Sequence, residues 1–153
     1  MDLRTRISTE LKQAMKDKAA QRLSTLRLVN AAIKDKDIAA RAEGTDEGVG
    51  EGEVLAILGK MAKQRLESAR AYEEGGRLDL AEREREEIEV IEEFLPRQLS
   101  EDETKAAVDA VVAQTGATSI RDMGKVMGAL KAKYTGQMDF GRVGPMLKER
   151  LSN

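Results

Sequence analysis

The chain has 153 residues and a formal net charge of −2, from 26 basic and 28 acidic side chains. Its length suits one compact domain, or one moderate domain with a small satellite, and is too short for a large multi-domain enzyme. Cysteine and histidine are both absent. Their absence excludes disulfides, thiolate nucleophiles, cysteine-based zinc sites and catalytic triads built on imidazole.

Apolar residues recur at helical spacing along nearly the whole chain, without convincing strand alternation, so the sequence predicts an all-α fold. The segment from Leu23 to Ile33 is apolar on more than one face, which indicates a central helix covered by the others. The stripes of the first three helices are Leu3, Ile7, Leu11 and Met15; Leu23, Leu26 and Ile33; and Leu55, Leu58, Ala62, Leu66 and Ala69.

Glycines and capping residues mark the breaks between these helices. Four glycines between residues 44 and 52 lie among acidic residues and predict a loop with a disordered tip after the second helix. Gly75 and Gly76 are expected to end the third helix. The spacing of Asp79 and Glu82 predicts a capping box that opens a fourth helix.

Pro96 closes the fourth helix, and Ser100 with Glu103 forms a second capping box directly after it. We therefore predict an N-terminal four-helix domain at 1–96 and a small three-helix tail domain at 97–153. The apolar patterns of the three tail helices run from Val108 to Gly116, from Ile120 to Gly136, and from Phe140 to Leu151.

Charge is distributed unevenly along the chain. Residues 1–42 carry ten basic and five acidic side chains, residues 43–99 carry eight and sixteen, and residues 119–150 carry seven and three. A polyanion should therefore prefer the two basic regions, and the basic first helices could extend a surface formed by the tail. The near-neutral total disfavours an indiscriminate nucleic-acid binder.

Basic residues of the tail surround two glycine-marked turns with little opposing acid, a pattern that fits phosphate binding and also fits an ordinary soluble surface. On the third predicted helix, polar residues fall within about one turn of each other, and an exposed polar face is the plainer interpretation there. The tail candidates are Arg121, Lys125, Lys131, Lys133, Arg142 and Lys148. The secondary surface candidates are Lys60, Lys63, Gln64 and Arg65.

Seven glutamates between Glu82 and Glu93 could be paired acids or metal ligands, but the interleaved Arg83 and Arg85 favour a solvated helix face. The methionines of the tail are interpreted as core residues, with a groove for a partner helix as the alternative. The sequence thus predicts no catalytic residue, no metal site and no cofactor.

Five motifs occur in order along the chain: Leu26 to Lys34, Lys63 to Ser68, Gly76 to Ala81 with Glu84, Phe94 to Ser100, and Asp122 to Gly128. Together they resemble the successive signatures of the GatB/YqeY family, as YqeY-like proteins carry them. Any one motif would be weak evidence, whereas five in register cover most of the chain.

This resemblance implies an N-terminal helical domain and a tail similar to the C-terminal domain of the B subunit of aminoacyl-tRNA amidotransferase. That enzyme converts Glu-tRNA(Gln) or Asp-tRNA(Asn) to the amide form, and its tail helps to recognise tRNA away from the reacting end. The present chain lacks the large catalytic domain of that subunit, and Gln137 stands where a basic residue often occurs. The matching positions are Met123, Gly124, Lys125, Met127, Gly128, Lys131, Lys133 and Gly136.

The favoured hypothesis is therefore a tRNA-associated binding module that is not an enzyme by itself. A protein-interaction adaptor for an aminoacyl-tRNA synthetase or an amidotransferase subunit is the main alternative. Carbon–nitrogen ligase activity, with glutamine as the amide donor, would follow from the family similarity only. No signal peptide or membrane-spanning stretch is evident, so we expect a cytoplasmic location, with neither a membrane nor DNA as a partner.

Overall fold

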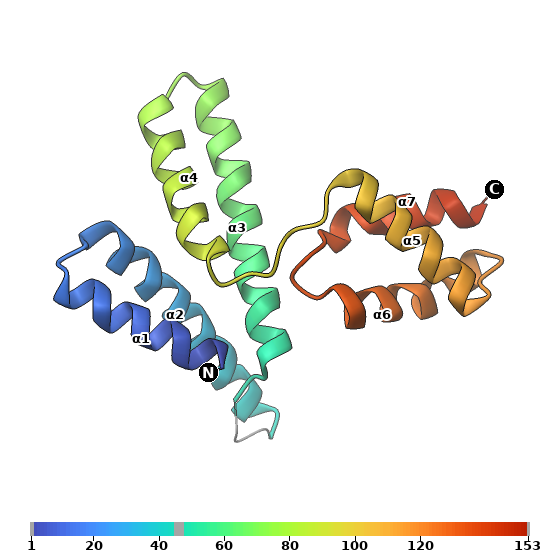
Figure 1. The fold of residues 1–153 in the computed structure, drawn as a ribbon, viewed down its shortest axis with the longest axis horizontal. Coiled ribbons are helices and arrows are strands. Elements are labelled where there is room, and N and C mark those ends of the chain that lie inside the picture. Colours follow the sequence, from blue (N-terminus) through green and yellow to red (C-terminus); the bar gives the residue numbers. More distant parts are fainter. Residues whose placement is uncertain (1, 45–47, 153) are drawn as a thin grey trace. The chain divides into compact units, whose positions relative to one another are not determined.

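The computed structural model describes residues 2–44 and 48–152 (Figure 1). Within these ranges the chain forms seven α-helices and one 3-10 turn and no strand, which confirms the predicted all-α class. The chain divides into two compact units, Met1–Leu95 and Pro96–Asn153. Each unit contains its own cluster of buried apolar side chains.

The first unit consists of two helical hairpins (Figure 1). Its helices are α1 (Leu3–Lys16), α2 (Ala20–Ala42), α3 (Glu51–Glu74) and α4 (Leu78–Glu92). Helices α1 and α2 pack together, as do α3 and α4, while α2 and α3 each contact all three other helices. The two hairpins therefore share a single core.

Side chains at helical spacing build this core. Leu3 and Ile7 of α1 are buried as predicted, but Met15 at the end of the same stripe is 51% exposed. Ala14, one residue earlier and therefore about 100° around the helix, is buried in its place. The other buried members are Leu26, Val29, Ile33, Val49, Val54, Leu58, Met61, Ile91 and Phe94.

The prediction that α2 is covered on more than one face is wrong. Thr25, Leu26, Val29 and Ile33 form its one buried face, whereas Leu28 is 45% exposed. Helix α3 also touches the three other helices, so α2 has no special central position. Of the extra apolar residues of α2, Leu28 and Ala31 are exposed, whereas Val29 and Ala32 pack into the core.

The turn between α3 and α4 confirms the predicted end of α3 and corrects the predicted start of α4. Gly76 adopts φ +77°, and the amide of Arg77 donates to the carbonyl of Tyr72 at 2.8 Å, which closes the helix in a Schellman-type turn. Helix α4 then begins at Leu78, so Asp79 lies inside its first turn and does not cap it. A carboxylate is favourable there because it faces the positive end of the helix dipole.

The connection between α2 and α3 is shorter than predicted, because Gly52 lies inside the first turn of α3. Residues 45–47, where a disordered tip was predicted, lie outside the described residues. The chain that follows is held at Val49, whose amide donates to the carboxylate of Asp37 at 2.9 Å. The same carboxylate accepts hydrogen bonds from the guanidinium of Arg4 at 2.5 and 3.0 Å. Arg4 also donates to the carbonyl of Val49, so α1, α2 and the entry to α3 are tied together.

The second unit consists of α5 (Glu101–Thr115), the 3-10 turn η1 (Ile120–Asp122), α6 (Met123–Tyr134) and α7 (Phe140–Ser152). The predicted capping box at Ser100 and Glu103 is present. The single pattern predicted from Ile120 is divided into η1 and α6, and Ser119 and Asp122 form a further capping box at the start of η1. The core of this unit contains Ala107, Val108, Val111, Val112, Val126, Leu130, Met138, Val143, Leu147 and Leu151.

Candidate nucleic-acid interface

Helix α6 is the element on which most of the candidate residues lie. Val126 and Leu130 are fully buried, which fixes the inner face of the helix. Gly124 and Gly128 lie on the other side, and a Cβ built on either would meet nothing within 4 Å. At about 100° per residue, Lys131 lies on this open face, whereas Lys133 lies on the side of the helix near Val126 and Leu130. The outer face of α6 is thus smooth and carries the cation of Lys131.

Three of the candidate cations have side chains that pair with nothing in the described part of the chain. Arg121, Lys131 and Lys148 are exposed, and none of their side chains forms an ion pair or hydrogen bond there. Arg121 belongs to η1, Lys131 to the last turn of α6, and Lys148 to α7. These three charges are available to an external anion.

Two other candidates already have structural contacts. The Lys125 Nζ donates to the carbonyl oxygen of Thr115 at 3.1 Å, where a cation stabilises the C-terminal end of α5. The Lys133 Nζ lies 5.5 Å from the centre of the Tyr134 ring, within the range of a cation–π contact. Replacing either lysine would therefore alter the tail itself as well as its charge.

The remaining cations of the second unit are paired with acids. Glu103 accepts from Arg97, which, with the amide of Ser100, lowers the pKa of this carboxyl to about 2. The N–O distances of these ion pairs are 2.8 Å for Arg97–Glu103, 4.0 Å for Lys105–Glu101, 3.8 Å for Arg142–Asp139 and 3.0 Å for Arg150–Asp109. Arg142, a candidate from its residue type, is therefore partly neutralised.

Gly136 serves the fold of the tail. Its φ of +78° reverses the chain after α6, and its carbonyl accepts a hydrogen bond from the side-chain amide of Gln98. The neighbouring Gln137 donates from Nε2 to the carbonyl of Arg97 at 3.1 Å and accepts from the amide of Leu99 at 3.0 Å. Gln137 thus holds this turn against the segment before α5, a role that the sequence did not suggest.

At the start of η1, two backbone amides are already bonded to a carboxylate. The carboxylate of Asp122 accepts from the amides of Thr118 and Ser119, at 3.0 and 3.4 Å. These bonds lower the pKa of Asp122, the bond from Thr118 being the larger cause. These two amides are therefore not free to bind an external anion. The Ser–x–x–Asp spacing from Ser119 to Asp122 was the sequence signal for this cap.

Helix α6 runs antiparallel to α5 and α7 in the tail (Figure 1), and α7 packs against both α6 and η1. Arg121, just before α6, therefore lies at the same end as the last turns of α7, which carry Lys148. Lys131 lies about ten residues farther along, or roughly 15 Å at helical rise. The three free cations thus span the length of α6, as contacts to a phosphate backbone would.

The secondary surface candidates on α3 divide into one residue with a largely buried side chain and three exposed ones. Arg65 forms an ion pair with Glu87 of α4 at 2.9 Å, and their side chains are only 15% and 19% exposed. Burial, followed by the charge of Glu87, raises the pKa of the adjacent Glu84. Arg65 therefore joins α3 to α4 and offers no charge to a ligand. Lys60, Lys63 and Gln64 are exposed.

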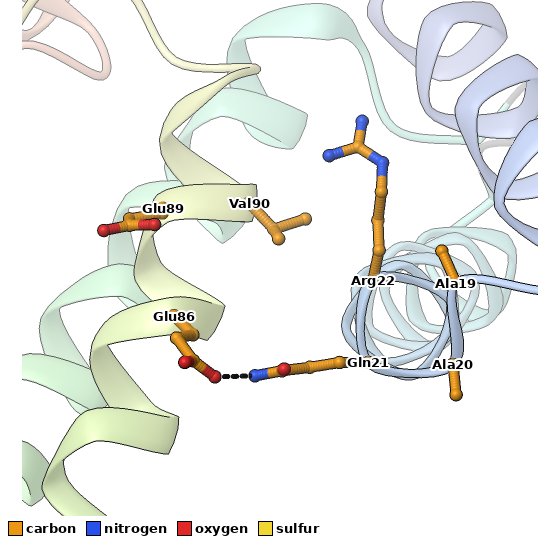
Figure 2. Close-up of a pocket in the computed structure, with 7 residues that line it drawn as sticks. All are labelled: Ala19, Ala20, Gln21, Arg22, Glu86, Glu89 and Val90. Carbon is orange, nitrogen blue, oxygen red and sulfur yellow. Dashed lines mark hydrogen bonds between the residues drawn. The ribbon is translucent and has the colours of Figure 1, made fainter.

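Other features of the described residues show no site for a small ligand. A shallow hollow of about 400 Å³ lies between the start of α2 and α4 and is bridged by a hydrogen bond from Gln21 to Glu86 (Figure 2). No group of three or more acidic side chains in this part of the chain is arranged to hold a metal ion. No helix in the same ranges is long and apolar enough to cross a membrane.

The methionines of the tail pack inside it. Met138 is buried, and Met123, Met127 and Met146 are partly buried against the same core. This confirms their interpretation as core residues.

Comparison with known proteins identifies relatives along almost the whole chain. Residues 4–151 match the model of the YqeY family, described as Yqey-like protein. The chain is 30% identical over 142 residues to altered inheritance of mitochondria protein 41, mitochondrial, of Meyerozyma guilliermondii, covering 89% of this chain and 72% of the relative.

Proteins of the same name from two further fungi match a shorter region. The identity is 36% over 89 residues for Clavispora lusitaniae and 33% over 95 residues for Lachancea thermotolerans. These matches cover 58% and 62% of this chain, and the chain spans about half, 49%, of the length of each relative. The extent of the family match and the Meyerozyma relative lead to one conclusion: the chain belongs to the YqeY-like protein family.

Proposed function

We propose that this protein is a tRNA-associated binding module whose tail contacts the RNA backbone through Arg121, Lys131 and Lys148. One contrast within the tail carries the proposal. These three side chains have no partner in the described part of the chain, whereas Arg97, Arg142 and Arg150 are paired with acids. A cation without an internal partner gains most from a phosphate, because no existing ion pair has to be broken. The proposed location is cytoplasmic, whereas the names of the fungal relatives describe those proteins as mitochondrial.

The composition of the tail supports backbone recognition over base recognition. Duplex RNA is bound mainly by shape and through phosphate and 2′-hydroxyl contacts. Single-strand recognition relies on aromatic side chains that stack on bases. Tyr134 is the candidate for stacking, but it is partly buried and Lys133 lies over its ring. The smooth outer face of α6, with Gly124 and Gly128, lets a backbone approach closely.

The two alternatives have weaker support. An adaptor that binds a synthetase or an amidotransferase subunit would need a docking surface, and the tail methionines are packed in its core. Carbon–nitrogen ligase activity rests only on similarity to the amidotransferase subunit. If the isolated chain formed Gln-tRNA from Glu-tRNA(Gln) and glutamine, the enzyme alternative would replace the binding module.

The test is tRNA binding, measured by fluorescence anisotropy, with a variant that removes the three free charges: Arg121→Gln/Lys131→Gln/Lys148→Gln. The matched control, Lys105→Gln/Arg142→Gln/Arg150→Gln, removes three charges that are paired with acids. We expect the first variant to lose on the order of 100-fold in affinity at about 100 mM salt, and the control to lose far less. Equal losses would contradict the assignment, and absence of wild-type binding would contradict the function.

A further inference from the structure

The outer face of α2 carries a straight row of cations. Arg27, Lys34 and Arg41 follow each other at intervals of seven residues, and seven residues complete almost two turns of a helix. All three side chains are exposed. The buried Leu26 and Ile33 lie about 100° around the helix from the cations that follow them, so the row lies outside the buried face of α2.

Several arginines of the first unit are neutralised by acids, in contrast to two members of this row. Among the ion pairs are Arg4–Asp37, Arg22–Glu10, Arg22–Glu93, Arg65–Glu87 and Arg85–Glu73. By contrast, the side chains of Arg27 and Lys34 form no ion pair or hydrogen bond within residues 2–44 and 48–152. Arg41 is close enough to Asp37 to contribute, after Arg4 and Val49, to its lowered pKa. Two of the three cations are therefore wholly available.

The neighbouring positions on the same face are compatible with close approach of a ligand. Ser24 and Ala31 lie beside the cations and are small and exposed, while Asp35 and Asp37 are the acids nearest to the row, and Asp37 is already bonded to Arg4. Leu28 and Ile38 are also exposed, but they are ten residues apart, roughly 15 Å along the helix, and form no continuous apolar patch. The face therefore favours a charged partner over an apolar one.

We propose that this row on α2 is a second binding surface for the phosphate backbone of structured RNA, separate from the tail. The three cations span about 21 Å of helix, so they can reach several phosphates of one strand. Helix α2 contains no aromatic residue, so base stacking cannot contribute to binding there. The inference rests on the proposed function only in naming the same ligand. It assigns RNA binding to the first unit as well as to the tail.

An acidic protein surface is the other class of partner for a row of cations. Counterion release distinguishes the two, because each phosphate contact adds about one unit to the slope of log affinity against log salt. Acidic side chains of a protein partner carry no condensed counterion layer of that kind. The salt dependence of tRNA binding by the full chain is therefore the informative measurement.

The experiment compares the full-length wild type with Arg27→Gln/Lys34→Gln. A matched control, Lys12→Gln/Lys16→Gln, removes the same charge from the exposed side of α1. Circular dichroism and thermal unfolding establish that both variants remain folded. We expect the α2 variant to reduce the salt slope for tRNA by about two and the affinity at about 100 mM salt by on the order of 50-fold, with little change in the control.

The outcomes separate this inference from the proposed function. If the α2 variant binds tRNA as the wild type does, while the tail variant loses binding, the row on α2 is not an RNA surface and the tail remains one. If the α1 control loses as much as the α2 variant, overall charge explains the effect and the specific row is contradicted. If the conservative pair Arg27→Lys/Lys34→Arg restores the slope, the positive charges themselves make the contact.

Discussion

At the scale of single residues, Gly48 is fixed by both its backbone and its neighbours. Its φ is +81°, and a Cβ placed there would lie 2.6 Å from Oδ1 of Asp37. We predict that Gly48→Ala lowers the free energy of unfolding by about 1–3 kcal/mol, because the side chain adds backbone strain and pushes Asp37 away from Arg4. Urea unfolding followed by circular dichroism measures this change.

Gly44 provides the matched control for that substitution. Its φ is also positive, at +97°, but a Cβ there would meet nothing within 4 Å. Gly44→Ala should therefore cost only the backbone strain and be clearly less destabilising than Gly48→Ala. Equal effects of the two substitutions would show that the contact with Asp37 contributes nothing.

Asp37 itself makes the stability of the first unit depend on pH. The hydrogen bond from Arg4, followed by that from the Val49 amide, lowers the pKa of Asp37 from 3.8 to about 2. A carboxyl whose pKa is lower in the folded state stabilises the fold above its unfolded pKa, and this contribution is lost as pH falls from about 4 to 2. We expect the thermal midpoint of the wild type to fall over that pH interval. The midpoint of Asp37→Asn should fall less over the same interval, because the variant has no carboxyl at this position.

The acid-induced change has a second contributor in the other unit. The pKa of Glu103 is also lowered to about 2, chiefly by Arg97, so some pH dependence will remain in Asp37→Asn. A single variant should therefore flatten the pH profile only partly, and Asp37→Asn/Glu103→Gln should flatten it further. An Asp37→Asn profile parallel to that of the wild type at every pH would contradict the role given to Asp37.

At the scale of the elements, the hairpin of α3 and α4 depends on polar contacts beyond its apolar base. Near the turn, the buried apolar residues are only Ala69 and Ala81. The pairs Arg65–Glu87 and Arg85–Glu73 join the two helices there, at 2.9 and 2.6 Å. The small alanines let the helices approach closely but contribute little buried area. The ion pair at Arg65 therefore has a structural role that its sequence position did not reveal.

We predict that Arg65→Ala destabilises the first unit by about 1–3 kcal/mol, because it leaves Glu87 largely buried without its partner. Arg65→Met/Glu87→Leu should recover part of that loss, since it removes both charges and retains apolar volume. Chemical denaturation of the two variants measures the difference. If Arg65→Ala unfolds at the wild-type denaturant concentration, the pair is not a structural contact.

Helix α5 offers a prediction for the second unit. The hydroxyl of Ser100 accepts from the amide of Glu103 at 3.1 Å, and the carboxylate of Glu103 accepts from the amide of Ser100 at 3.0 Å. Ser100→Ala should therefore cost about 1 kcal/mol of stability in the tail, the usual loss for a helix cap. Ser100→Asp should retain the cap. Hydrogen exchange of the first amides of α5 detects the local opening that we expect in the alanine variant.

Several elements were predictable from the sequence because their signals are local. The cap at Ser100 depends on two residues three apart, and the end of α3 depends on Gly76 and its neighbours. The start of α4 was predicted wrongly because Asp79 is favourable both as a cap and inside the first turn, and the sequence does not distinguish these positions. The division of the pattern from Ile120 to Gly136 into η1 and α6 was missed, because the apolar spacing continues through the junction between them.

At the scale of the whole molecule, the sequence predicts the types of the site residues but not their partners. Lys125 and Lys131 are both exposed lysines of α6. Lys125 Nζ donates to the carbonyl of Thr115 in another helix, whereas the side chain of Lys131 has no partner in the described part. Arg27 and Arg65 differ in the same way. Ion pairing between helices depends on tertiary packing, so only the structure separates cations that hold the fold from those that can bind a ligand.

The most direct test of RNA binding is the affinity of the unmodified full-length chain for tRNA at about 50 and 200 mM salt. If the free cations of the tail and of α2 contact phosphates, the affinity should fall by on the order of 100-fold between these conditions. An absence of binding at the lower salt concentration, or an affinity that is the same at both concentrations, would contradict the claim that this protein binds the phosphate backbone of RNA.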